Sequence, residues 1–181
     1  MAKNAEKIVQ KDDPVLRLKA REIAPSEIGS PEVKGAIERT KKALTEEPDG
    51  VAIAAPQIGV SLRLFVVSGK VFSTKEELES GKITAPDLIF INPKIIKHSR
   101  KNLHLEEGCL SIRWLYGKVR RADKTTVEAY DERGKKFTRG GSGLLSQIFQ
   151  HEIDHLEGIL FTDKAKNLHE LRPENKDKDE K

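Results

Sequence analysis

The sequence predicts one domain of the α+β class, with antiparallel strands. Its length of 181 residues suits a single globular domain. Two segments carry the start and stop signals of helices. Several short segments rich in β-forming residues are separated by tight turns, which favours hairpins over parallel βαβ units. We expect the domain to cover residues 1–171, with residues 1–12 loose and a charged, disordered tail at residues 172–181.

The first predicted helix begins after Ser30. Serine is a preferred N-cap, and Pro31 suits the first helical position. Pro48 places the end of this helix near Glu46. Apolar side chains recur on one face at Val33, Ile37 and Leu44.

Five segments are predicted to be strands. Residues 125–130 alternate, with Val127 and Ala129 on one face, and the turn at residues 131–134 makes a hairpin with the strand that follows. Residues 88–91 and 94–98 flank Asn92-Pro93. The five segments are residues 62–67, 88–91, 94–98, 125–130 and 135–138.

The last predicted element is a helix over residues 144–156. The glycine-rich run GGSG at residues 140–143 breaks the chain sharply before it, and Gly158 closes it.

Composition excludes several classes of protein. The one cysteine, Cys109, forbids an intramolecular disulfide, and no apolar stretch approaches the ~20 residues of a membrane span. The N-terminus lacks the apolar core of a secretory signal, so we expect a cytoplasmic protein with no membrane partner, and an organellar location is the alternative. Residues 94–121 hold eight basic and two acidic side chains, a net +6 within a chain of net +4. This basic segment is either a solvated face or a contact for an acidic partner such as RNA; no stable DNA binding is expected.

The run HEIDH at residues 151–155 has the HExxH spacing of a metal site. Two histidines four residues apart lie one turn apart on a helix, so His151 and His155 can reach one metal ion. Glu152 can then lie beside a water at the metal and accept its proton. The alternative is a pair of histidines on a helix surface.

A catalytic site of this kind needs a third protein ligand. Position 161 is Phe161, which excludes the metzincin pattern. Cys109 is the stronger candidate, because a thiolate and two imidazoles leave the fourth position open and accept iron, zinc, nickel or cobalt. The weaker candidates lie near the charged tail, at His169, Glu170 and Glu174.

Two further features suit a peptide substrate. Leu144 and Ile148 continue the face of the two histidines, so we expect either an apolar wall beside the metal or two core residues, and the two interpretations are compatible. The run GVAIAAPQ at residues 50–57 has small side chains that let a peptide backbone come close, and Gln57 can donate to an oxyanion.

Together these segments resemble the peptide deformylases. That family carries GxGLAAxQ, EGCLS and QHExDH in this order, and the chain has GVAIAAPQ at residues 50–57, EGCLS at 107–111 and QHEIDH at 150–155. The resemblance covers about residues 8–165. It implies antiparallel sheets packed around a central helix that carries the HExxH motif.

The resemblance also implies an activity, which is hydrolysis of the formyl group from the N-formyl-methionine end of new polypeptides, with release of formate. Cys109, His151 and His155 would hold one divalent metal per chain, ferrous iron before zinc, nickel or cobalt. Glu152 would be the general base and then the acid. Gln57 and the N–H of Leu110 would hold the oxyanion. The peptide groove would be lined by Gly50, Val51, Ala52, Leu105, Glu107, Gly108, Leu144, Gln147 and Ile148.

Two positions depart from the family pattern. Ala52 replaces a glycine, and Gln147 stands where the family has an apolar residue near the methionine pocket. Two other functions therefore stay open, a non-catalytic binder of formylated N-termini and another small HExxH metallohydrolase or peptidase. Nascent peptides as substrate and the basic segment together suggest association with the ribosome.

Overall fold

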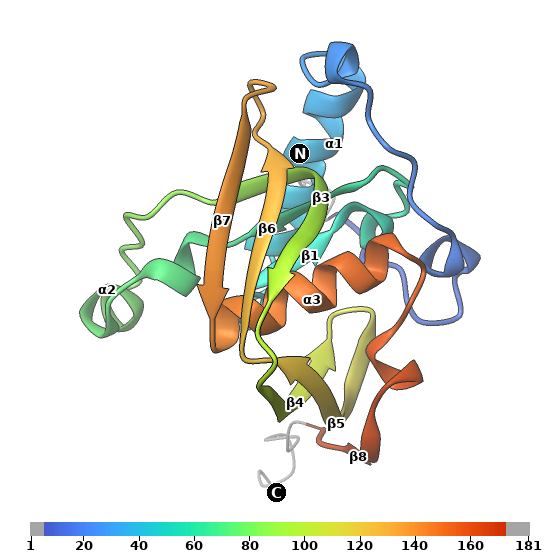
Figure 1. Cartoon of the computed structure of the whole chain (residues 1–181), viewed down its shortest axis with the longest axis vertical. Helices are drawn as coiled ribbons and strands as arrows, with labels where there is room; N and C mark the ends of the chain where they lie inside the picture. Colours follow the sequence, from blue (N-terminus) through green and yellow to red (C-terminus); the bar gives the residue numbers. More distant parts are fainter. Residues whose placement is uncertain (1–5, 173–181) are drawn as a thin grey trace, which may run out of the picture.

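The computed structural model describes residues 6–172, and its helices and strands form two antiparallel sheets with one helix between them (Figure 1). The larger sheet has the strand order β1-β2-β3-β6-β7, and the smaller has the order β4-β5-β8. The strands are β1 (Ala52–Ala54), β2 (Leu64–Val67), β3 (Leu88–His98), β4 (Asn102–Cys109), β5 (Ile112–Ala122), β6 (Lys124–Tyr130), β7 (Lys136–Ser142) and β8 (Lys166–Glu170). The helices are α1 (Pro31–Thr45), α2 (Lys75–Ser80) and α3 (Leu144–Leu156). The prediction of an α+β fold with antiparallel sheets around a central helix is confirmed.

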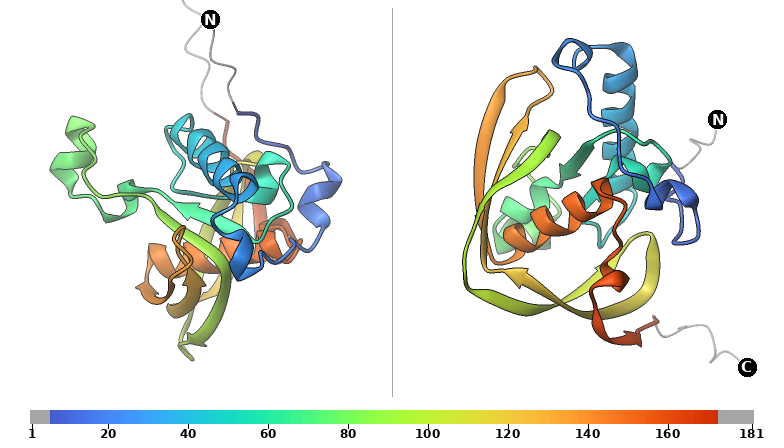
Figure 2. Two further views of the ribbon diagram at one scale, coloured as in Figure 1. Left: turned by 90° about the horizontal axis from the view of Figure 1, so that it is seen from above. Right: turned by 45° about the vertical axis from the view of Figure 1, so that its right-hand side comes forward.

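Strand β2 shows how the larger sheet is covered on both faces. Its four residues are all buried although successive side chains point to opposite faces, so both faces of the sheet are covered here. Phe65 packs with the side chains of α3, whereas Leu64 packs with those of α1. The views in Figure 2 agree that α1 and α3 lie on opposite sides of these strands.

Three aromatic rings join α3 to the larger sheet. The rings of Phe65 and Phe90 are stacked with centroids 4.6 Å apart, and Phe149 of α3 meets Phe90 edge-on at 5.2 Å. Such pairs contribute about 0.5–1.5 kcal/mol beyond area burial. Val127 and Ala129 lie in the same cluster, as their alternation predicts. This packing fixes α3 relative to the sheet.

The predicted helices and the hairpin are present. Ser30 accepts a hydrogen bond from the N–H of Val33 and so caps α1, and β6 pairs with β7 through the predicted turn. Residues 88–98 differ from expectation, since they form one strand, β3, instead of two. The chain passes Pro93 because Asn92 adopts a φ of 49° and its side chain bonds both the N–H and the carbonyl of Ile23.

The two ends of the chain can be compared with the predictions of a loose segment at residues 1–12 and a disordered tail at residues 172–181. The N–H of Val9 donates to the carbonyl of Gln57 over 2.9 Å, within the segment expected to be loose. The charged tail lies outside the described residues except for Arg172, so its disorder stays a prediction. Across residues 6–172, no helix combines the length and the apolar character that crossing a membrane requires.

Candidate active site

The three predicted metal ligands lie together. Cys109 ends β4, and His151 and His155 lie one turn apart on α3. One ligand atom from each residue falls within 4.8 Å of the others, and the Sγ of Cys109 is 3.2 Å from the Nε2 of His155. Among the described residues, this is the one group of three or more histidine, cysteine or carboxylate side chains that lie close enough together to hold a metal ion. His169 lies elsewhere, paired with Glu106, and Glu170 pairs with Arg172.

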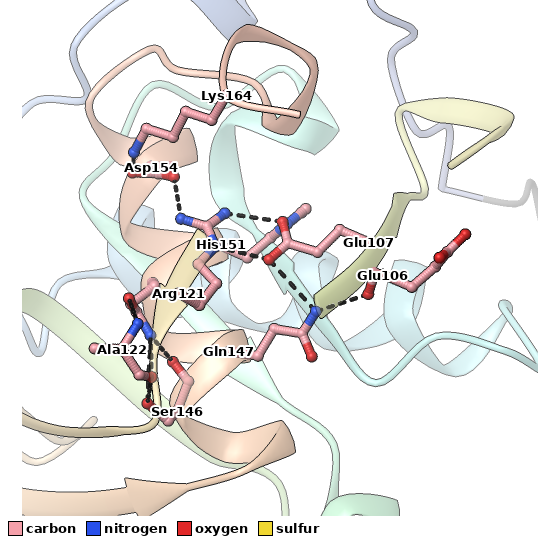
Figure 3. Close-up of polar contacts among 10 residues, drawn as sticks. Glu106, Glu107, Arg121, Ala122, Ser146, Gln147, His151, Asp154 and Lys164 are labelled. Carbon is pink, nitrogen blue, oxygen red and sulfur yellow. Dashed lines mark hydrogen bonds and ion pairs between the residues drawn. The ribbon is translucent and has the colours of Figure 1, made fainter. Parts of the chain in front are cut away.

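Polar contacts anchor α3 to the end of β5. The hydroxyl of Ser146 donates to the carbonyl of Ala122 over 2.8 Å. The amide of Gln150 accepts from the N–H of Ala122 and donates to its carbonyl, at 2.9 and 3.0 Å. The first two turns of α3 are thereby held against the end of β5 (Figure 3).

A buried network of ion pairs contacts the Nδ1 side of the His151 ring (Figure 3). Arg121 donates two hydrogen bonds to the carboxylate of Glu107, at 2.7 and 2.8 Å, and one to Asp154 at 2.6 Å. The other oxygen of Asp154 accepts from Lys164. Glu107 lies 3.0 Å from the Nδ1 of His151. This contact sets the tautomer and ring orientation and leaves the Nε2 of His151 for a metal.

Burial and neighbouring charges shift the pKa values of Glu107 and His155. Burial alone would raise the pKa of Glu107, but hydrogen bonds from Arg121 and His151 outweigh burial and lower the pKa to about 2. Burial lowers the pKa of His155 well below its usual value, so its ring is neutral and its nitrogen lone pair is available to a metal.

Glu152 is prepared as a general base. Its side chain is buried with Oε2 lacking a hydrogen-bond partner among the described residues, yet it lines the site cavity. Burial raises the pKa of Glu152 to about 7, and the neighbouring Glu107 adds to the rise, against the opposing effects of His151 and Arg121. A carboxyl group with a pKa near neutrality both accepts and returns a proton efficiently.

Gln57 is held with its N–H groups toward the cysteine. Its Oε1 accepts from the N–H of Ala54 over 2.8 Å, which fixes which way the amide faces. Its Nε2 donates to the hydroxyl of Ser111 at 3.2 Å and lies 3.5 Å from the Sγ of Cys109. The amide donor of Gln57 thus lies beside the candidate metal ligand Cys109.

One cavity of about 260 Å³ contains these groups. Thirteen of the predicted site residues line it, namely Gly50, Val51, Ala52, Gln57, Glu107, Gly108, Cys109, Leu110, Leu144, Gln147, Ile148, His151 and Glu152. Leu105 is not among the residues that line this cavity, and its place in the peptide groove stays a prediction. It pairs with Val119 in the β4–β5 ladder.

Gln147, which stands where the family has an apolar residue, makes polar contacts with β4. Its Nε2 donates to the carbonyl of Glu106 over 2.8 Å and lies 3.4 Å from the carboxylate of Glu107 (Figure 3). The amide therefore ties α3 to β4 at the cavity wall.

Two groups of functional residues were missed by the sequence analysis. Arg121 was counted with the basic segment, but it is buried at 3% exposure and paired with Glu107 and Asp154. Residues 113–116 of β5 form one wall of the cavity, and no sequence motif marks them. Both depend on strand pairing that local patterns do not specify.

Comparisons with known proteins agree with this geometry. The family model described as polypeptide deformylase matches residues 5–171. Peptide deformylase 2 of Clostridium acetobutylicum is 40% identical over 153 residues, which cover 84% of this chain and 89% of the relative. Peptide deformylase 1A of Arabidopsis thaliana, described as chloroplastic/mitochondrial, is 40% identical over 87% of this chain and 60% of its own length.

Solved structures extend the similarity to the fold. A peptide deformylase from Synechococcus elongatus in complex with actinonin matches with a TM-score of 0.79 at 34% identity, covering 92% of this chain and 84% of that one. A class I type b peptide deformylase from Acinetobacter baumannii, bound to Met-Ala-Ser, matches with a TM-score of 0.75 at 28% identity, covering 87% and 96%.

Proposed function

The chain belongs to the peptide deformylase family, and from this premise we propose how its own residues remove the formyl group from N-formyl-methionyl polypeptides. The observation that carries the proposal is the convergence of Cys109, His151 and His155 beside the buried carboxyl of Glu152. This is the donor set and base of a metal-dependent hydrolase.

The three ligands fit a divalent metal, and we assign ferrous iron to the site before zinc, nickel or cobalt. One thiolate and two imidazoles form a mixed soft and borderline donor set that suits these ions. The Nε2 of His151 is left for coordination by the contact of Nδ1 with Glu107. When bound, the metal supplies Lewis-acid polarisation and lowers the pKa of a coordinated water.

Glu152 moves the proton. As a carboxylate it accepts a proton from the attacking water, and as a carboxylic acid it returns that proton to the departing amine. Its pKa of about 7 supports both roles, because neither protonation state is strongly favoured near neutral pH. Formate and a free N-terminus leave the site.

Gln57 and Leu110 hold the charge that develops on the formyl oxygen. The Nε2 of Gln57 is directed beside Cys109 by the bond from Ala54 to its other amide atom. Leu110 follows Cys109 directly and lines the cavity, and we assign its N–H as the second donor. Donors that are fixed before reaction need no reorganisation when the charge appears.

The methionine side chain occupies the apolar part of the cavity. Val51, Leu144 and Ile148 line it, and a flexible thioether chain adapts to such a surface. Ala52 lies in the β1–β2 ladder opposite Val67, where its methyl group is nearly buried. Ala52 lines the cavity from strand β1 without a positive φ, so the backbone at this position does not require a glycine.

The test is formate release from formyl-Met-Ala-Ser by anaerobically purified protein loaded with ferrous iron. We expect release from this peptide, none from acetyl-Met-Ala-Ser, and a loss of at least about 100-fold in Glu152→Ala with metal content retained. Tight peptide binding without release would favour a non-catalytic binder. Glu170→Gln, which changes an exposed carboxylate outside the cavity, is the matched control.

We further propose that the protein acts in the cytoplasm and meets ribosomes through the basic segment at residues 94–121. Six of its basic side chains are exposed, namely Lys94, Lys97, Arg100, Lys101, Lys118 and Arg120, and of these Lys101 pairs with Asp123. Arg113 and Arg121 are less exposed and are paired within the chain. Co-sedimentation with ribosomes should be seen at low salt and lost at high salt. Its absence at low salt would overturn the association.

A further inference from the structure

The pairing between strands β4 and β5 is interrupted beside the three candidate metal ligands, Cys109, His151 and His155. Cys109 pairs with Ile112 and Glu107 pairs with Gly117. Between these pairs β4 contributes one residue, Gly108, and β5 contributes four, residues 113–116. All four line the cavity. Bulges of this kind re-aim side chains next to active sites, so this wall faces the substrate.

The bulged wall is fixed at both edges. On one side, the N–H of Leu171 donates to the carbonyl of Trp114 over 2.8 Å, and β8 pairs with the residues that follow. On the other side, Arg113 forms ion pairs with Glu47 and with Asp49, the latter at 3.1 Å. Asp49 also lines the cavity, from the segment that leads into β1. The ion pairs therefore connect two walls of the cavity.

Trp114 is strained and exposed in this wall. Its φ is 65°, in the left-handed region, which costs a residue with a side chain about 1–2 kcal/mol. The residue is 37% exposed, and the guanidinium of Arg113 lies 5.7 Å from the ring centre. An exposed ring recovers little of this cost by burial. A strained bulky residue at an active site points to a role in function.

We propose that Trp114 determines specificity for the residues that follow the formyl-methionine. Its ring packs against the side chain of one of the next two residues of the peptide and favours aromatic and large aliphatic side chains there. The peptide beyond methionine must leave the metal cluster along the cavity walls, and residues 113–116 form one of them. Aromatic contacts of this kind add about 0.5–1.5 kcal/mol to the burial of the side chain. The inference rests on the proposed deformylase function.

The first test compares kcat/KM among three peptides, formyl-Met-Phe-Ser, formyl-Met-Ala-Phe and formyl-Met-Ala-Ser. The protein should prefer one of the two phenylalanine peptides over the alanine-serine peptide by about 10-fold. The preference should fall to about 1 in Trp114→Gly and in Trp114→Asn, two residues that tolerate this φ. Because each ratio is measured on one preparation, an inactive fraction cancels.

Ile96→Ala is the matched control, since Ile96 is an exposed apolar side chain on β3 that does not line the cavity. It should keep the preference. A ratio near 1 in the unmodified protein, or a preference that survives in both Trp114 variants, overturns the proposal.

The second test separates a failure of this inference from a failure of the function. Trp114 is the only tryptophan of the chain, so intrinsic tryptophan emission reports on its ring alone. The product peptides Met-Phe-Ser and Met-Ala-Phe are titrated against Met-Ala-Ser, with binding measured in parallel by equilibrium dialysis. A larger blue shift with one phenylalanine peptide is expected as its side chain covers the ring. Binding without a shift, or no binding, overturns the role of Trp114 even where no formate is released from any peptide.

Discussion

At the residue scale, the site depends on side chains whose hydrogen-bonding atoms are already committed. Gln57 is the clearest case, because the bond from Ala54 to Oε1 leaves only Nε2 to face Cys109. His151 is treated the same way by Glu107 at Nδ1. Orientation before substrate binding is what makes a donor effective against developing charge.

The change Gln57→Leu tests this orientation. It removes the donor while keeping similar volume, so we expect kcat to fall about 100- to 1,000-fold with a smaller change in KM. Steady-state formate release measures both constants. A loss confined to KM would mean that Gln57 binds the ground state and the transition state equally.

At the element scale, the direction of the chain after α3 depends on Gly158. This glycine has a φ of 74°, and a Cβ built on it lies 2.6 Å from the carbonyl oxygen of Arg17. Helix α2 ends similarly at Gly81, with a φ of 69°, but nothing lies within 4 Å of a Cβ there. The two glycines share a backbone conformation and differ in the space around them.

Alanine substitutions separate strain from steric clash. Gly81→Ala should cost about 1 kcal/mol of unfolding free energy, because it meets only the left-handed backbone penalty. Gly158→Ala should cost about 2–5 kcal/mol, because the methyl group must also displace the backbone of Arg17. Urea unfolding of the two variants measures the difference. Equal costs would contradict the clash.

At the scale of the whole molecule, Arg121 connects β5, β4 and α3 through one buried set of charges. It bonds Glu107 of β4 and Asp154 of α3, and Asp154 in turn accepts from Lys164. Removing one member of a buried charge pair is strongly destabilising, because the partner is left without compensation. The stability of the domain should therefore depend on pH.

The folded-state pKa of Glu107 is about 2, below its ordinary value of 4.5. A depressed carboxylate pKa contributes stability that is present above the unfolded value and is lost as pH falls through the folded value. Unfolding free energy of metal-free protein should thus decrease between about pH 4.5 and 2, by on the order of 3 kcal/mol from this group. Urea titrations across this range measure it, and Glu107→Gln should flatten the decrease.

Sequence signals between neighbouring residues were sufficient to predict several elements and part of the site of this protein. The caps of α1, the turn between β6 and β7 and the placement of both histidines on one face of α3 depend on neighbours within one or two turns of chain. The motif order at residues 50–57, 107–111 and 150–155 was enough to identify the family, because three ordered motifs carry most of the catalytic groups.

Other features were decided only by the tertiary structure. Arg121 looked like part of a basic surface until strand pairing and the packing of α3 surrounded it with Glu107 and Asp154. Trp114 lies in the wall of the cavity because β5 bulges opposite Gly108. Helix and turn signals act between residues close in sequence, whereas the burial and partners of a charge or ring are set by segments far apart in the chain.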